Sequence, residues 1–120
     1  MKGLSQKYRT ALVTGGTSGL GLAFCEMLVA KGVKTFSASR HPSKLPSISG
    51  LHGVELDLAD LSSVADFAQS FVEEHGVPDL LINNAGYGAF FEWDRFPEEE
   101  IAGQLDVMLK APALLCRSFA

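Results

Sequence analysis

The sequence predicts an α/β fold: a doubly wound parallel sheet of four strands in the order 3-2-1-4, with helices on both faces and an incomplete C-terminus. Short β-prone apolar runs alternate along the chain with segments whose apolar residues recur at helical spacing. Each connection is long enough for a right-handed crossover, so successive strands are expected to lie parallel. The third observation is a glycine-rich segment, Gly15–Gly21, between the first run and the helix that follows it.

The first half of the chain contains two predicted strands and one helix. The first strand is predicted over Thr10–Thr14, and it leads through the glycine-rich segment into a helix whose apolar residues recur from Leu20 onwards. Gly32, which can adopt a left-handed conformation, ends that helix. A second strand is predicted over Val33–Ser39. The polar segment His41–Ser47 contains two prolines, so we expect it to be irregular.

The second half repeats this alternation. A third strand is predicted over Val54–Leu56, followed by a helix that Asp60 can cap and that ends at Gly76. A fourth strand, Asp79–Ile82, is mostly apolar, and in the predicted order it forms an open sheet edge with its apolar side chains exposed. A last helix is predicted to begin at Pro97, with acidic residues in its first turn and an apolar side that continues to the end of the chain.

Composition limits the classes of protein to consider. The 120 residues fit one domain, residues 1–120, and are 47% hydrophobic and 20% charged, as in an ordinary globular protein. The formal net charge is −4 and the basic residues are scattered, which argues against nucleic acid as a partner. No apolar run reaches membrane-spanning length and the first residues are too polar for a signal peptide, so we expect no membrane and a cytoplasmic location.

The potential metal-binding and redox residues show no grouping in the sequence. Cys25 and Cys116 lie far apart, each among apolar residues at helical spacing. We expect two reduced thiols in the core rather than a disulfide or a reactive nucleophile. The three histidines are equally scattered and lack metal-ligand spacing, so we expect no metal.

The glycine-rich segment predicts an anion site. Glycines let the backbone turn tightly and approach a ligand, while the first N–H groups of the helix and its positive dipole end favour a phosphate. A dinucleotide is the expected ligand. Gly16 and Gly21 fit the spacing of an ATP-binding loop, but Leu22 stands where that loop needs lysine, so ATP is disfavoured. The alternative is a glycine-rich turn with no ligand.

Three motifs follow the predicted strands in order: Thr14-Gly15-x-x-x-Gly19-x-Gly21, Asp57-Leu58 and Asn83-Asn84-Ala85-Gly86. On these motifs the chain resembles the short-chain dehydrogenase/reductase family over essentially all of its length. It matches only the N-terminal half of that family's NAD(P)-binding, Rossmann-like domain. The resemblance implies an oxidoreductase that interconverts an alcohol and a carbonyl by hydride transfer on a small-molecule substrate. It also implies a homo-oligomer of complete domains, associated through the last predicted helix.

The resemblance also implies a role for each motif. The glycines accommodate the pyrophosphate, Asp57 bonds the adenine amino group, and the Asn83–Gly86 motif lines the ribose and nicotinamide side, with Asn84 as a structural tie. The alternative for Asp57 is a turn or cap residue before the next helix. The full set of candidate cofactor-binding residues is Gly15, Thr17, Ser18, Gly19, Leu20, Gly21, Ser39, Arg40, Asp57, Leu58, Asn83, Ala85 and Gly86.

The end of the second strand indicates which cofactor is bound. An NAD-binding protein places Asp or Glu there to accept the ribose hydroxyls, whereas this chain has Ser39 and Arg40. Arg40 can hold a 2′-phosphate with charge-assisted hydrogen bonds, and Ser39 can add a donor. We therefore expect NADP, with NAD possible. The alternative is a solvated surface arginine.

The catalytic residues that the family uses are not found within these 120 residues. The family uses a serine and a Tyr-x-x-x-Lys motif, but here Tyr8 is followed at that spacing by Leu12, and Tyr87 by Phe91. We assign no catalytic residue within the chain and expect the 120 residues alone to be inactive. Alternatives to an enzyme are a non-catalytic dinucleotide-sensing or scaffold protein and a truncated gene product.

Two features of the last third of the chain leave alternatives open. Met108 stands where many family members have an asparagine. The resemblance implies that this asparagine supports a kinked helix, whose free main-chain carbonyl holds a water in the proton relay. Pro112 can supply that kink, because it lacks the N–H that would bond the carbonyl of Met108. Alternatively, Pro112 begins a separate helix after a loop. The aromatic segment Tyr87–Phe96 can line a substrate pocket, pack on the next helix or meet a partner subunit.

Overall fold

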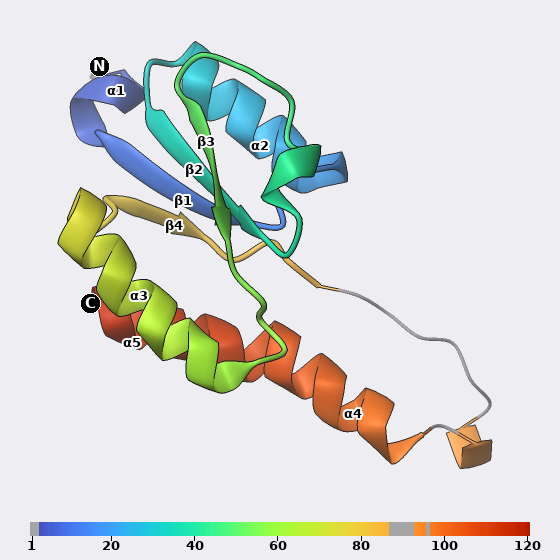
Figure 1. Ribbon diagram of the computed structural model, residues 1–120. Helices are drawn as coiled ribbons and strands as arrows, with labels where there is room; N and C mark the ends of the chain where they lie inside the picture. The colour runs from blue at the N-terminus through green and yellow to red at the C-terminus, as the bar shows by residue number, and fades with distance from the viewer. Residues whose placement is uncertain (1–2, 87–92, 96) are drawn as a thin grey trace.

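The protein is an open parallel sheet with helices on both faces, seen in a computed structural model that describes residues 3–86, 93–95 and 97–120 (Figure 1). The strand order is β3-β2-β1-β4, which confirms the predicted 3-2-1-4 topology. The strands are β1 (Thr10–Thr14), β2 (Lys34–Ser39), β3 (Leu51–Glu55) and β4 (Leu80–Ile82). The helices are α1 (Leu4–Lys7), α2 (Gly19–Ala30), α3 (Leu61–His75), α4 (Glu98–Leu105) and α5 (Ala111–Phe119).

The strand register brings the carboxyl ends of the strands together at one edge of the sheet. Every pairing is parallel: Thr14 of β1 lies opposite Ala38 of β2, which in turn lies opposite Val54 of β3. On the other side of β1, Val13 lies opposite Ile82 of β4. In open α/β sheets ligands bind outside the carboxyl ends of the strands, so this edge is where a site is expected.

Side chains that alternate along the strands build two separate cores. Leu12 of β1 faces the helices α3 and α5, where it belongs to a cluster with Phe71 and Leu115. Its neighbours Ala11 and Val13 point to the opposite face and pack with residues of α2. Figure 1 shows this layering, with α2 on one side of the sheet and α3 beside α5 on the other. The two central strands are therefore buried on both faces, and their buried polar residues are the small Thr14, Thr35 and Ser37.

Polar side chains fix the ends of two elements. The Asp60 side chain caps α3 by accepting from the backbone N–H of Ser63 at 3.4 Å and the hydroxyl of Ser62 at 2.7 Å, and these hydrogen bonds lower the pKa of Asp60. Asp79 joins β1 to β4: its Oδ2 accepts from the N–H groups of Arg9 at 2.8 Å and Thr10 at 3.2 Å, which lower the pKa of Asp79.

Three sequence expectations about the sheet and its loops were wrong in detail. β3 begins at Leu51 rather than Val54, because pairing with β2 supplies hydrogen bonds that its own polar sequence does not reveal. Within the loop expected to be irregular, Pro42–Lys44 forms a 3₁₀ turn, which suits a proline at its first position. The side chains of β4 are half-buried rather than exposed, because they pack on the two cores and only the outer backbone edge is open.

The two cysteines differ in environment. Cys25 lies fully buried in the α2 core, and burial raises the pKa of its thiol to about 11, with the adjacent Glu26 carboxylate adding to the rise. Cys116 on α5 is exposed, which corrects the expectation of two core thiols. Cys116 lies on the outer side of α5, whereas Ala111 and Leu115 on the opposite side of this helix are buried against the sheet. Both cysteines are free.

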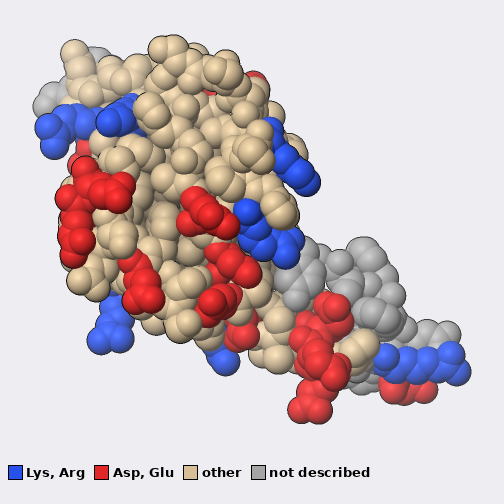
Figure 2. Space-filling model, in the orientation of Figure 1, with Lys and Arg blue, Asp and Glu red and all other residues tan. Residues whose placement is uncertain are grey.

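The chain has 14 Asp and Glu residues against 10 Lys and Arg residues. On the face shown in Figure 2, Asp and Glu side chains gather over α3 and α4, while the Lys and Arg side chains of the described residues lie scattered. Within the parts of the chain that the structure describes, no helix combines the length and apolar character needed to cross a bilayer.

Candidate functional site

The turn between β1 and α2 has the backbone geometry of an anion site. Gly15 and Gly19 have φ of +71° and +56°, in the left-handed region that favours glycine. A Cβ built on Gly19 would meet no atom within 4 Å, so the space in front of the helix start is open. Ser18 at the N-cap makes no side-chain capping bond, which leaves the first N–H groups of α2 to an external acceptor. Leu20 is 66% exposed beside them.

Hydrogen bonds hold this turn against the end of β4. The Thr14 hydroxyl oxygen accepts from the backbone N–H groups of Asn84 and Ala85, each at 3.1 Å. The Asn84 side-chain amide donates to the carbonyl of Gly15 at 3.3 Å. Asn84 is therefore the structural tie that the sequence suggested. The Thr14 hydroxyl also ties the turn to the end of β4, through its two hydrogen bonds, although the sequence analysis gave it no role.

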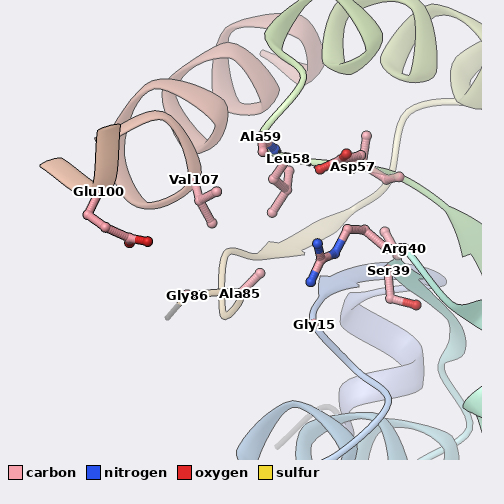
Figure 3. A pocket seen from close by; sticks show the side chains of 12 residues that line it. Gly15, Ser39, Arg40, Asp57, Leu58, Ala59, Ala85, Gly86, Glu100 and Val107 are labelled. Atoms are coloured by element: carbon pink, nitrogen blue, oxygen red, sulfur yellow. Dashed lines mark hydrogen bonds between the residues drawn. The ribbon is translucent and has the colours of Figure 1, made fainter. Parts of the chain in front are cut away.

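The ends of β1, β2 and β3 and the loop after β4 surround a pocket of about 450 Å³ (Figure 3). α4 and the π-helical turn Asp106–Lys110 close it on another side, through Glu100 and Val107. Seven of the sequence-predicted residues line it: Gly15, Ser39, Arg40, Asp57, Leu58, Ala85 and Gly86. The remaining lining residues were not predicted: Ala38, Leu56, Ala59, Glu100 and Val107.

Ser39 and Arg40 enter this pocket from the end of β2. The Oγ atom of Ser39 is fully buried and has no hydrogen-bond partner in the described parts of the chain. Arg40 is exposed, and among the described residues it makes no ion pair. Figure 3 shows its guanidinium reaching across the pocket towards the Gly15 side. In the same view the Ser39 hydroxyl points away from this guanidinium. The Arg40 cation is the group here that an anionic ligand would satisfy.

Asp57 has the turn role considered for it, and it also lies at the pocket wall. One carboxylate oxygen, Oδ1, accepts from the backbone N–H of Ala59 at 3.0 Å and so shapes the loop. The side chain is also exposed at the pocket wall, beside the buried Leu58. Capping of α3 belongs to Asp60, so Asp57 keeps a carboxylate oxygen for a ligand.

The other predicted residues lie outside this pocket. Of the glycine-rich turn only Gly15 lines the pocket, and the predicted residues from Thr17 to Gly21 do not. Asn83 points elsewhere: its side-chain amide lies 3.6 Å from the Sγ atom of Cys116 on α5. Of the aromatic segment, residues 87–92 and 96 lie outside the described residues. Among those described, no three His, Cys, Asp or Glu side chains are grouped as a metal ion requires.

The helix after Pro97 runs from α4 through the π-helical turn into α5 without a loop, so Pro112 does not begin a separate helix. The N–H of Ala111 bonds the carbonyl of Asp106, five residues earlier. Because Pro112 has no N–H, it donates neither to Met108 nor to Val107. The Met108 side chain lies against Gly86, with Cγ 3.6 Å from the position of a Cβ built there.

Comparison with known proteins agrees with this geometry. A family model described as short chain dehydrogenase matches residues 9–120. An uncharacterized oxidoreductase of Schizosaccharomyces pombe is 32% identical over 105 residues, covering 87% of this chain and 36% of the relative. The 3-oxoacyl-[acyl-carrier-protein] reductase MabA of Mycobacterium bovis is 42% identical over 93 residues, covering 77% of this chain and 36% of the relative.

Comparison with solved structures finds the same fold. A metagenomic short-chain oxidoreductase in complex with NADP superposes with a TM-score of 0.85 at 31% identity, covering 92% of this chain and 54% of the other. The chain thus spans about a third to a half of the length of the relatives it matches. A family model that matches nearly the whole chain, together with the strand order and the three motifs, leads to one conclusion. This chain belongs to the short-chain dehydrogenase family.

Proposed function

We propose that this chain is the cofactor-binding half of an oxidoreductase that prefers NADP and interconverts an alcohol and a carbonyl. The observation that carries the proposal is the pair Ser39 and Arg40 at the end of β2, in one pocket with Asp57. The guanidinium of Arg40, which makes no ion pair within the described residues, suits a 2′-phosphate, and the small Ser39 adds no negative charge beside it. An acidic residue at this strand end would favour NAD. NAD is the alternative cofactor.

The relatives support the class of reaction. The Mycobacterium bovis relative is named a 3-oxoacyl reductase, and the metagenomic oxidoreductase was solved with NADP. The cofactor, when bound, supplies the hydride that reduces a carbonyl. The residues of this chain bind and orient it: the turn from Gly15 to Gly21 receives the pyrophosphate, and Asp57 and Leu58 receive the adenine. The substrate is a small molecule, and complete domains associate as a homo-oligomer.

The experiment is a comparison of NADPH and NADH binding to the chain and to Arg40→Ala, followed by the fluorescence of the reduced nicotinamide. Loss of a charge-assisted contact to the 2′-phosphate should weaken NADPH binding by about ten- to a hundredfold, equivalent to about 1.5–3 kcal/mol. NADH lacks that phosphate, so its affinity should change little. Arg117→Ala is the matched control, because Arg117 on α5 is also exposed but does not line the pocket.

An equal loss for both cofactors would show that Arg40 does not bind the 2′-phosphate. If the isolated chain is unfolded by circular dichroism, the same substitutions can be placed in a chimera. In that chimera this chain replaces the matched half of the metagenomic oxidoreductase.

Met108 favours a second candidate, a non-catalytic dinucleotide-sensing or scaffold protein, because it stands where the family has asparagine. The two candidates differ in turnover. A full-length protein containing these residues should oxidise NADPH in the presence of carbonyl substrates if it is an enzyme, whereas a sensor should bind NADPH without consuming it.

A further inference from the structure

A groove runs between the edge strand β3 and the helix α3. It has two parts, of about 190 and 440 Å³, which are continuous because they share Glu55, Phe67 and Ser70. The α3 residues that line it recur three or four positions apart from Asp60 to His75, so they form one stripe along the helix. A 15-residue helix is about 22 Å long, the length of six or seven residues of extended chain.

The lining of this groove is apolar at its base and acidic at its rim. Phe71 is buried, and Val54 and Phe67 are half-buried. Exposed carboxylates surround them, from Glu55, Asp57, Asp60, Asp66 and Glu74. Figure 2 shows acidic side chains gathered over α3 on this face. No Lys or Arg lines the groove, and among the described residues none forms an ion pair with these carboxylates.

The carboxylates alone do not indicate a ligand, but the strand beside them has an unpaired edge. In a parallel pair every second residue directs its N–H and C=O groups to the neighbouring strand. The N–H of Leu56 donates to the carbonyl of Ser39 at 2.9 Å, so Val54 also faces β2. Gly53 and Glu55 therefore direct their N–H and C=O groups outward, and within the described sheet β3 pairs only with β2.

β3 lacks the features that usually protect an exposed strand edge. Its residues, Leu51–Glu55, include neither Lys nor Pro, and its pairing with β2 continues without a bulge. The turn at Pro42 packs on the α2 side of the strand, where a Cβ on Gly53 would lie 3.0 Å from the Cβ of Pro42. The α3 side stays open, since His52 is exposed and Val54 is half-buried.

We propose that the β3 edge and the groove beside it form a docking surface for an extended basic segment of a partner protein. The segment adds to the sheet as a further strand, with main-chain hydrogen bonds to Gly53 and Glu55. Every second side chain then enters the groove, where apolar groups pack on Phe67 and Phe71 and Lys or Arg side chains reach the carboxylates. A second copy of this chain is disfavoured, because it would bring an equally acidic groove against this one. The proposal does not depend on the bound cofactor.

The experiment measures binding of the fluorescent peptide Lys-Val-Lys-Val-Lys-Val-Lys by anisotropy, and hydrogen exchange of the Gly53 and Glu55 amides by NMR. The peptide should slow both amides by about tenfold near saturation. Asp66→Lys and Glu74→Lys should each weaken binding by about three- to tenfold. Glu73→Lys is the matched control, because Glu73 is exposed on the same helix but does not line the groove, and its affinity should stay within about twofold.

Two further peptides separate strand addition from simple charge attraction. The same peptide N-methylated on every backbone nitrogen keeps its charge but cannot donate to β3, so it should bind at least about tenfold more weakly. The peptide with Glu in place of Lys should not bind. If the isolated chain is unfolded by circular dichroism, the same measurements are made in a chimera that completes the domain.

Four results would overturn the proposal. The first is no binding of the Lys peptide, and the second is equal weakening by Glu73→Lys and Glu74→Lys, which would indicate diffuse attraction. The third is equal binding of the N-methylated peptide or unchanged exchange at Gly53 and Glu55, which would exclude strand addition. The fourth is slow exchange without peptide that grows with protein concentration, which would place a second copy of the chain on this edge.

Discussion

Gly21 is the residue at which the turn between β1 and α2 has the least freedom. A Cβ at Gly21 would overlap the carbonyl oxygen of Gly15 and lie 2.5 Å from the amide nitrogen of Asn84. The carbonyl is backbone and cannot rotate away, so an added methyl group must displace the turn itself. Gly19 is constrained differently: its φ is +56°, but the space around a Cβ is open.

This difference leads to a prediction for two alanine substitutions. Gly21→Ala should lower the free energy of unfolding by about 2–4 kcal/mol and weaken NADPH binding, because the backbone must shift. Gly19→Ala should cost about 1–2 kcal/mol, the price of a left-handed conformation alone. Chemical denaturation of both variants measures the two values. A larger loss in Gly19→Ala would contradict the packing argument.

At the same scale, the residues that sequence reasoning found differ from those it missed. Arg40 and Asp57 could be predicted because each follows a strand in the parallel sheet, and those strand ends meet at one edge. Glu100 could not be predicted, because its place in the first turn of a helix already explained its charge. The hydroxyl of Thr14 was missed because its acceptor role depends on β4, which is distant in sequence.

At the scale of elements, the sequence predicted the ends of a helix well where it contains both a capping residue and a terminating glycine. The bounds of α3 match the sequence prediction because Asp60 caps one end and Gly76 follows the other. β3 was predicted too short, because its first residues are held by hydrogen bonds to β2 rather than by their own apolar pattern. The π-helical turn Asp106–Lys110 has no periodic signature of its own, so only the proline pointed to an irregularity.

Pro112 provides the test for this helix. Pro112→Ala restores an N–H that can bond the carbonyl of Met108, so the π-helical turn should shorten towards regular α-helix. The free energy of unfolding should rise by about 1–3 kcal/mol, since proline in a helix interior is unfavourable. Pro97→Ala is the control, because Pro97 precedes α4 as its N-cap, and its effect should stay within about 0.5 kcal/mol.

The readout for Pro112→Ala is denaturant unfolding together with a structure of the variant. Unchanged stability and a retained π-helical turn would show that packing against Gly86, rather than the proline, shapes this segment. A full-length enzyme adds a second readout. There, capture of the Met108 carbonyl should impair proton transfer more than NADPH binding.

At the scale of the whole molecule, the sheet and the helix after Pro97 contribute different walls of the pocket. The strand ends supply the glycine turn, the cation and the carboxylate that face the pocket, while α4 supplies its outer wall. This arrangement makes α4 project beyond the sheet, as Figure 1 shows, so part of its surface lacks support from the cores. Large apolar side chains are exposed there, namely Ile101 (43%), Leu105 (47%), Met108 (53%) and Leu109 (63%).

Two surfaces of the 120-residue chain therefore favour association. β4 pairs only with β1 and leaves an open backbone edge in the described sheet, and the apolar side chains of α4 and the π-helical turn form a stripe. We expect the isolated chain to self-associate with increasing concentration, as measured by sedimentation and light scattering. The double substitution Leu105→Lys and Leu109→Lys should reduce this association, whereas Leu20→Lys, equally exposed but beside the glycine turn, should not. A monomeric mass at every concentration, with a well-dispersed NMR spectrum, would contradict the expectation and show that neither surface mediates self-association.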